Sequence, residues 1–226
     1  MRKGALPKYT RVYMAKIVQR YKDAWANPYF RISLMLAVPL FVGALFVNFW
    51  AIEFATERAG GAVPDIILSN TPAIEVDGLF VYGTMALIAF AALILLAHPG
   101  RIPFSLLGVT LFILMRSAFT LMTHLGTPEL NYDSDFGDAV TSIFFGADQF
   151  FSGHTGMPFL GALAFWHLPF VRNVFLAASV YFAGVVLLGH IHYTIDVASA
   201  FFITYGIYHL ALWLFPRERA LFTSSK

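Results

Sequence analysis

Residues 149–170 carry the sequence QFFSGHTGMPFLGALAFWHLPF, in which a polar Ser-Gly-His-Thr corner comes directly before an uncharged apolar run. A second polar corner, GHIHYTIDV at 189–197, opens the last long apolar segment. It places His192 and Asp196 four residues apart, and residues at this spacing share one face of a helix. A carboxylate at that position can hold the imidazole. The two stretches predict apolar helices whose polar ends meet.

The composition indicates a multi-pass membrane protein rather than a soluble domain. Of 226 residues, 58% are hydrophobic and only 12% are charged, and several uncharged runs approach twenty residues. The chain has no cysteine, which excludes disulfides and thiolate metal sites. The first apolar run starts near Ile32 and is too long for a signal peptide, so we expect the first helix to be retained.

Six apolar segments are long enough to span a bilayer if each is helical. They are Ile32–Ala55, Leu79–Ala97, Phe104–Leu125, Phe151–Phe170, Val174–Gly189 and Val197–Phe215. We see no internal repeat. We therefore expect an all-α membrane protein with one six-helix domain (32–215), preceded by a basic segment (1–31) and followed by a short cytoplasmic tail (216–226).

The basic segment 1–31 is predicted to form an amphipathic helix on an anionic cytoplasmic leaflet. It holds eight basic residues against one acid, Asp23, with Tyr13, Ile17, Tyr21 and Trp25 at helical spacing. The alternative is a solvated basic tail that only obeys topology rules. Nucleic-acid binding is disfavoured.

The distribution of charge predicts the orientation. With the N-terminus in the cytoplasm, the outer loops hold Arg58 as their one basic residue, which agrees with the positive-inside rule. The outer side then collects the acids Glu57, Asp65, Glu75, Asp77, Glu129, Asp133, Asp135, Asp138 and Asp148. Both termini are expected in the cytoplasm, and the two polar corners at the outer face.

Two histidines and a carboxylate at a membrane surface suggest phosphoryl chemistry with imidazole as the nucleophile. Asp196 would set the tautomer of His192 and stabilise its imidazolium, leaving the other ring nitrogen to attack phosphorus. Protonated His154 would deliver a proton to the departing alkoxide. Arg116 lies inside the third span, where an arginine needs a polar partner such as a lipid phosphate; the alternative is a structural pairing with Asp196 or a helix-end carbonyl.

The Ser152-Gly153 corner is the expected phosphate contact. Backbone N–H groups at a helix N-terminus approach anionic oxygens closely where the chain carries a glycine. The histidines His98, His124, His167 and His209 are expected to be interfacial or packing residues, and His190 stays open.

These motifs resemble the sphingomyelin synthase family, a branch of the type 2 phosphatidic acid phosphatase superfamily. SGHT at 152–155 and HYTIDV at 192–197 carry the likeness, together with RSAFTLMT at 116–123 and Val-Pro-Asp at 63–65. Asp148 also matches the acid of the family's Gly-Asp-x-x-x-Ser-Gly-His run, although Ala147 replaces the glycine. The likeness covers roughly residues 30–215 in the same six-span order.

The resemblance implies an integral-membrane lipid phosphotransferase with a phosphatidic acid phosphatase-like helical bundle. His154, His192 and Asp196 would form its catalytic triad, and His192 would carry the covalent intermediate. The family moves phosphocholine or phosphoethanolamine from a glycerophospholipid to ceramide, releasing diacylglycerol, at the outer or lumenal face and without a metal or other cofactor. Its partners would therefore be a donor phospholipid and an acceptor lipid alcohol. We expect site support or head-group contacts from Asp65, Asp148, Tyr193 and His190.

The short chain and loops suit a bacterial inner-membrane relative with another acceptor or head group. The alternatives are a lipid phosphate phosphatase or phospholipase C-type hydrolase of the same superfamily, and a transporter or channel with Arg116 and Asp196 as a coupling site. The phosphatases resemble a Pro-Ser-Gly-His and Ser-Arg-x5-His-x3-Asp pattern. This chain has Phe151 in place of that proline, and Val185 and Val186 in place of the Ser-Arg pair, so Arg116 is the fixed cation that remains. That balance favours a phosphodiester, which carries one negative charge. A calcium site at Asp133, Asp135 and Asp138 is disfavoured because the spacing is not that of an EF-hand loop.

Overall fold

The computed structural model describes residues 8–128 and 149–224, and every regular element within those ranges is helical. The disfavoured calcium site at Asp133, Asp135 and Asp138 and the expected supporting residue Asp148 lie outside the described residues. The helices are α1 (Lys8–Ala26), α2 (Pro28–Glu57), η1 (Leu68–Asn70), α3 (Asp77–Ala97), η2 (Pro99–Arg101), α4 (Ile102–Met122), α6 (Gly153–Ala164), α7 (Pro169–Leu188), α8 (Thr194–Leu214) and α9 (Pro216–Ser224).

Five helices in the described part of the chain are long and apolar enough to cross a membrane. They are α2, α3, the continuous stretch Pro99–Met122 that includes α4, α7 and α8. Their outward faces carry large apolar side chains such as Phe202 and Trp213, which are 81% and 76% exposed. In water such a surface would be a liability, whereas lipid chains cover it. The protein is therefore a multi-pass membrane protein.

The expected fourth span, Phe151–Phe170, is helical only over Gly153–Ala164. Twelve residues at the α-helical rise cover about 18 Å, which is less than the roughly 30 Å of a hydrocarbon core. The chain turns after Ala164, and Pro169 becomes the first residue of α7. Proline suits the first position of a helix, where an N–H would have no partner within the helix. Inside a continuous helix it would remove a backbone hydrogen bond.

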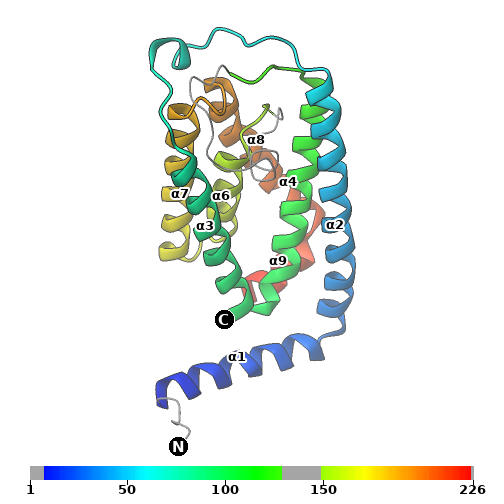
Figure 1. Ribbon diagram of the computed structural model, residues 1–226. Helices are drawn as coiled ribbons and strands as arrows, with labels where there is room; N and C mark the ends of the chain where they lie inside the picture. The colour runs from blue at the N-terminus through cyan, green and yellow to red at the C-terminus, as the bar shows by residue number, and fades with distance from the viewer. Residues whose placement is uncertain (1–7, 129–148, 225–226) are drawn as a thin grey trace, which may run out of the picture.

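The bundle has two halves that meet around α4, α6 and α8. α2 packs along α4, α6 packs between α7 and α8, and α4 also contacts α8. The buried side chains of α2 include Ala37, Ala44 and Ala51, spaced by seven residues, and small residues at this spacing let two membrane helices approach closely. In Figure 1, α2 and α4 stand together on one side, and α3, α6 and α7 on the other.

The two ends of the bundle differ in character. The helices α1 and α9 lie at the lower end in Figure 1, where α1 runs crosswise to the long helices. Within the basic segment, Lys8–Ala26 is helical as predicted, and α2 begins at Pro28 rather than near Ile32, after the N-cap Asn27. The expected tail is also helical: α9 buries Phe222 completely. The connection from α2 to α3 crosses the upper end, where the predicted site lies.

Candidate active site

The two polar corners of the sequence meet through a backbone hydrogen bond. The N–H of Ser152, which precedes α6, donates to the carbonyl oxygen of Asp196 in the first turn of α8 at 3.1 Å. His154 stands at the second position of α6, and His192 lies two residues before α8 begins. The helices α6 and α8 also pack against each other. The structure therefore brings the predicted triad residues to one end of this helix pair.

Asp196 is held rigidly beside His192. Its side chain is fully buried, and its Oδ2 atom accepts the backbone N–H of Tyr193 at 3.0 Å, which caps α8. Nδ1 of His192 lies 3.5 Å from the same Oδ2 atom, within ion-pair range but without hydrogen-bond geometry. Catalytic hydrogen bonds are often long before substrate binds and tighten afterwards. The same Oδ2 atom thus faces both the helix cap and the imidazole.

His154 sits among aromatic side chains. Its ring centroid lies 4.2 Å from that of Phe80 on α3 and 6.1 Å from that of Phe182 on α7. His192 and Arg116 are both close enough for their charges to act on His154. The apolar rings restrict water around this imidazole and fix its orientation. Phe80 was not singled out in the sequence, since no local pattern shows that α3 packs against α6.

Arg116 contacts the Ser-Gly corner directly. Its Nε atom donates to the carbonyl oxygen of Phe151 at 2.8 Å, and the side chain is 9% exposed. A Cβ atom added to Gly153 would lie 3.2 Å from Arg116 Nε, so glycine permits the close approach. Because α4 ends at Met122, Arg116 lies six residues, about 9 Å, from the end of its helix. This bond to a backbone carbonyl just before α6 is of the structural kind that the sequence analysis gave as the alternative, and a contact from Arg116 to phosphate stays a prediction.

Ser152 serves as the N-cap of α6. Its Oγ atom accepts the N–H of Thr155 at 3.4 Å and donates to the Thr155 hydroxyl at 3.1 Å, and the residue is fully buried. Ser, Thr, Asp and Asn are preferred at this position because they satisfy an otherwise unpaired helix N–H. The hydroxyl thus orients the turn that carries His154. A direct contact from Ser152 to phosphate stays a prediction.

Asp65, in the loop between α2 and α3, holds Thr194, the first residue of α8. Its Oδ2 accepts the N–H of Thr194 at 2.8 Å, and its Oδ1 accepts the Thr194 hydroxyl at 2.6 Å. Oδ1 also accepts the N–H groups of Ile67 and Leu68 at 2.9 and 3.0 Å. Burial alone would raise the pKa of the Asp65 carboxyl, but these hydrogen bonds, the Thr194 hydroxyl foremost, hold that pKa below its ordinary value. Asp65 therefore stays ionised and positions the turn that holds His192.

Tyr193 joins three segments at the end of the bundle that carries the site. Its hydroxyl donates to the carbonyl oxygen of Gly126 at 3.0 Å and accepts the N–H of Val63 at 3.2 Å. The side chain is 2% exposed. The predicted supporting role of Tyr193 is thus structural here: the residue beside the candidate nucleophile is fixed by the loops that follow α2 and α4.

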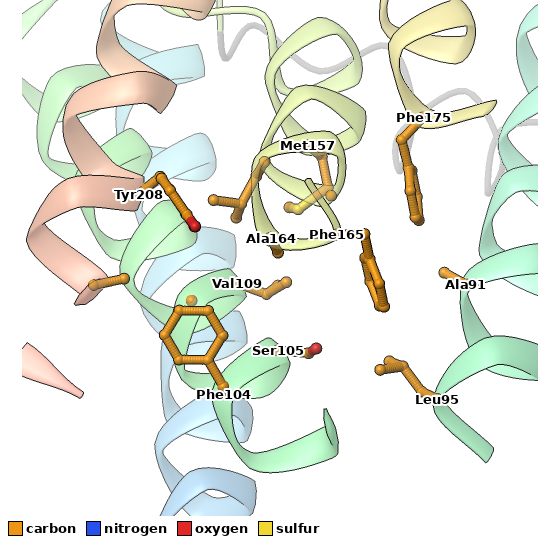
Figure 2. A pocket seen from close by; sticks show the side chains of 14 residues that line it. Ala91, Leu95, Phe104, Ser105, Val109, Met157, Ala164, Phe165, Phe175 and Tyr208 are labelled. Atoms are coloured by element: carbon orange, nitrogen blue, oxygen red, sulfur yellow. The ribbon is translucent and has the colours of Figure 1, made fainter. Parts of the chain in front are cut away.

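An apolar cavity of about 120 Å³ begins one turn below His154. Figure 2 shows Met157 of α6 at its wall with Phe104, Val109 and Tyr208, and the lining comes from α3, α4, α6, α7 and α8. Met157 is three residues from His154, so both lie on one side of α6. The polar residue His154 and the apolar cavity therefore lie about one turn apart along α6.

No group of three His, Cys, Asp or Glu side chains that could hold a metal ion occurs within residues 8–128 and 149–224. Comparisons of the chain with family models, with curated proteins and with solved structures gave no significant match. The assignment of chemistry therefore depends on the residues and their geometry.

Proposed function

We propose that this protein is a membrane-embedded lipid phosphotransferase. It moves a phosphate-linked head group from a glycerophospholipid to a lipid alcohol such as ceramide and releases diacylglycerol. The observation that carries the proposal is the placement of His192, whose Nδ1 faces the buried carboxylate of Asp196 while Ser152 ties this turn to the His154 corner.

In the first step, Nε2 of His192 attacks phosphorus and the bond between phosphorus and the diacylglycerol oxygen breaks. The proton for that oxygen comes from His154, which leaves diacylglycerol as a neutral alcohol. Asp196 stabilises the positive charge on His192 from the Nδ1 side. Arg116, which lies against Gly153, stabilises the negative charge that develops on the phosphoryl oxygens.

In the second step, the hydroxyl oxygen of the acceptor lipid attacks phosphorus and the phosphorus–nitrogen bond breaks. The proton of that hydroxyl returns to His154, and His192 is released with its electron pair. His154 is protonated before the first step and neutral before the second, so each step leaves this residue in the state that the other step needs. No cofactor is required for these two steps, because one phosphodiester is exchanged for another.

The apolar cavity of Figure 2 supports a lipid substrate. A glycerophospholipid has its phosphate at the boundary between a polar and an apolar part, and the site has the same division along α6. We propose that α6, fourth in chain order, completes a six-helix phosphatidic acid phosphatase-like bundle together with the five longer helices, and that it enters the membrane only part of the way. The charge distribution supports cytoplasmic termini and an outward-facing site in a bacterial inner membrane.

The deciding experiment uses purified protein in lipid nanodiscs with a labelled phosphodiester phospholipid, with and without ceramide. The proposal expects diacylglycerol and a new phospholipid when the alcohol is present, and no turnover in His192→Ala. His209→Asn is the matched control, because His209 is exposed on α8 beside Tyr205. An acid-labile phosphoryl label on the protein should form with donor alone and be absent from His192→Ala.

The competing activities give different products in the same assay. Release of diacylglycerol without a new phospholipid would indicate a phospholipase C-type hydrolase. Preference for phosphatidic acid over phosphodiester lipids would overturn the transferase in favour of a phosphatase, because the phosphatase motifs gather three cations around a monoester, whereas Arg116 is the fixed cation that remains in the motifs of this chain. No turnover of any lipid would favour a transporter or channel.

A further inference from the structure

A groove of about 390 Å³ lies on the surface of the bundle between α3 and α7, which stand side by side in Figure 1. We call it the α3–α7 groove; its lining includes Glu75, Gly78, Leu79, Tyr82, Gly83 and Tyr181. Tyr82 is 70% exposed and Tyr181 is 40% exposed. The groove therefore faces the surroundings of the bundle rather than its core.

The depth of the groove matches the boundary between hydrocarbon and head groups. α3 has 21 residues, which span about 32 Å at the α-helical rise, close to the roughly 30 Å of a hydrocarbon core. Its first residue is Asp77, so the segment from Gly78 to Gly83 lies within about 9 Å of that end of the helix. Glu75 precedes the helix, on its polar side. The molecules beside this groove are therefore the head groups of one leaflet.

The side chain of Tyr181 crosses from α7 to α3. Its hydroxyl donates to the carbonyl oxygen of Leu79 at 3.1 Å, and a Cβ atom added to Gly83 would lie 3.1 Å from its Cε1 atom. Tyrosines at membrane interfaces commonly place the hydroxyl among the head groups. Here the hydroxyl is bonded to α3, so the exposed side chain presents its ring.

Tyr82 contributes a second ring from α3. A Cβ atom added to Gly78 would lie 3.9 Å from Tyr82 Cδ2 and 4.0 Å from its Cε2, so the ring lies over the position four residues nearer the start of the helix. The ring is thereby directed towards the end of α3 that Glu75 precedes. Two aromatic rings, one from each helix, are thus exposed in one groove.

Glu75 places a carboxylate at the polar end of the groove. Its backbone is fixed on both sides: the N–H of Ile74 donates to a carbonyl oxygen at the end of α7 at 2.9 Å, and Val76 packs directly on Gly189. The Glu75 side chain is exposed, and its carboxylate has no hydrogen bond or ion pair within residues 8–128 and 149–224. The turn that follows α7 also carries His190, which is 6% exposed with a backbone φ of 51°; a contact from His190 to a head group stays a prediction.

The charge around this end of α3 is negative. Glu75 and Asp77 together outweigh the helix N-terminus, which carries about half an elementary positive charge. Residues 129–148, which the structure does not describe, contain five acids and no Lys, Arg or His. That segment therefore supplies neither a basic partner for Glu75 nor positive charge. A ligand of the groove gains from being cationic.

We propose that the α3–α7 groove docks a zwitterionic phospholipid by its ammonium group, which lies against the rings of Tyr82 and Tyr181 and beside the carboxylate of Glu75. Aromatic faces and a carboxylate are the groups that bind alkylammonium ions, quaternary ones included. Choline and ethanolamine head groups carry such a cation at this depth, whereas an anionic head group would be repelled by Glu75. This docking site lies apart from His192, and it does not depend on the proposed phosphotransfer.

The chain has no cysteine, so a single introduced cysteine can carry a fluorophore beside the groove. Ile74→Cys places it there, because Ile74 is 49% exposed, precedes Glu75 and is outside the lining. Met122→Cys is the matched control: Met122 is 68% exposed and ends α4, which runs antiparallel to α3 after a tight connection, so it lies at the same end of the bundle. The quencher is a phosphatidylcholine whose choline nitrogen carries a nitroxide, present as a small fraction of the lipid in nanodiscs that hold the full chain.

In a host of phosphatidylglycerol, quenching at position 74 should exceed quenching at position 122 by about threefold, on the scale of one cation–π contact. The excess should disappear in a host of phosphatidylcholine or phosphatidylethanolamine, because these lipids compete for the groove. Equal quenching at the two positions in phosphatidylglycerol would refute the proposal and leave the groove to another occupant, such as a partner protein. An excess that persists in phosphatidylcholine would also refute it. The readout needs no turnover, so its outcome is independent of the proposed reaction.

Variants in the groove separate the aromatic ring from the hydroxyl. Tyr82→Phe keeps the ring and should retain the excess quenching at position 74, whereas Tyr82→Leu should abolish it. Glu75→Gln should remove most of the excess, and Glu53→Gln is its control, since Glu53 is an exposed acid near the same end of α2. Equal losses in Tyr82→Phe and Tyr82→Leu would show that Tyr82 is an interfacial anchor acting through its hydroxyl and would overturn the proposal. So would an unchanged excess in Glu75→Gln.

Discussion

The contact between Asp65 and Thr194 can be measured with a double-mutant cycle. Asp65→Ala removes every hydrogen bond to the carboxylate, whereas Thr194→Val removes only the hydroxyl donor at 2.6 Å from Oδ1. A hydrogen bond to a charged group contributes about 1.5–3 kcal/mol, and both residues are half-buried, so we expect a coupling energy of about 1–2 kcal/mol. The cycle isolates this term because the Thr194 N–H is retained.

The assay is the free energy of unfolding of the four proteins in detergent micelles, followed by the turnover of each with a phosphodiester lipid. Loss of the contact should also lower turnover, because Thr194 begins the helix between His192 and Asp196. Thr223→Val is the matched control: its hydroxyl donates to the Arg219 carbonyl on α9, at the opposite end of the bundle, and its effect should add to that of Asp65→Ala. If the effects of Asp65→Ala and Thr194→Val add within about 0.5 kcal/mol, the loop does not position α8 and the reasoning fails.

Three further predictions concern packing and pH. In Gly156→Ala, the new Cβ would lie 2.7 Å from Thr204 Oγ1 and 2.9 Å from Phe112, so we expect a loss of about 1–3 kcal/mol of stability; an unchanged melting temperature would contradict this packing. Thr204 is fully buried and its hydroxyl has no partner among the described residues, so Thr204→Val should stabilise the protein by about 1 kcal/mol, and a destabilised variant would show that the hydroxyl is bonded. Burial, with the charges of Arg101 and Arg20, lowers the pKa of His98 to about 4 from the ordinary 6.5. Between these pH values the unfolded chain binds a proton at His98 and the folded protein does not, so stability falls as pH drops from 6.5 towards 4. His98→Gln should flatten the profile of melting temperature against pH in that window. Identical profiles for the two proteins would refute this account.

The long apolar helices were predictable from the sequence, whereas the length of the helix after Ser152 was not. Hydropathy depends on composition, and the run from Phe151 to Phe170 stays uncharged through the turn that separates α6 from α7. Pro169 was the local signal for a new helix, since proline favours the first turn. The helical tail α9 was missed for a similar reason: its stability comes from Glu218, which accepts the hydroxyls of Tyr29 and Ser33 on a helix far away in sequence.

The convergence of His154, His192, Asp196 and Arg116 was predictable because each motif placed its residue at the end of a helix or inside one. The contacts between those residues and distant segments were not. Nothing near Asp65 in sequence shows that its carboxylate bonds Thr194, and the packing of Phe80 on His154 depends on how α3 and α6 meet. Local patterns carry the chemistry, while the long-range partners that orient it appear only in three dimensions.

The docked C-terminal helix α9 affects how topology can be mapped. A fusion made after Phe215, where the last apolar segment ends, would remove Glu218 from Tyr29 and Ser33 and would delete Phe222, which packs on Phe104 and Phe165. Truncated reporters of that kind would measure a chain whose first and last membrane helices are no longer fastened at their lower ends. Reporters should instead follow residue 226, or be inserted within the loop between α2 and α3 of the otherwise intact chain, so that the orientation they record is that of the native bundle.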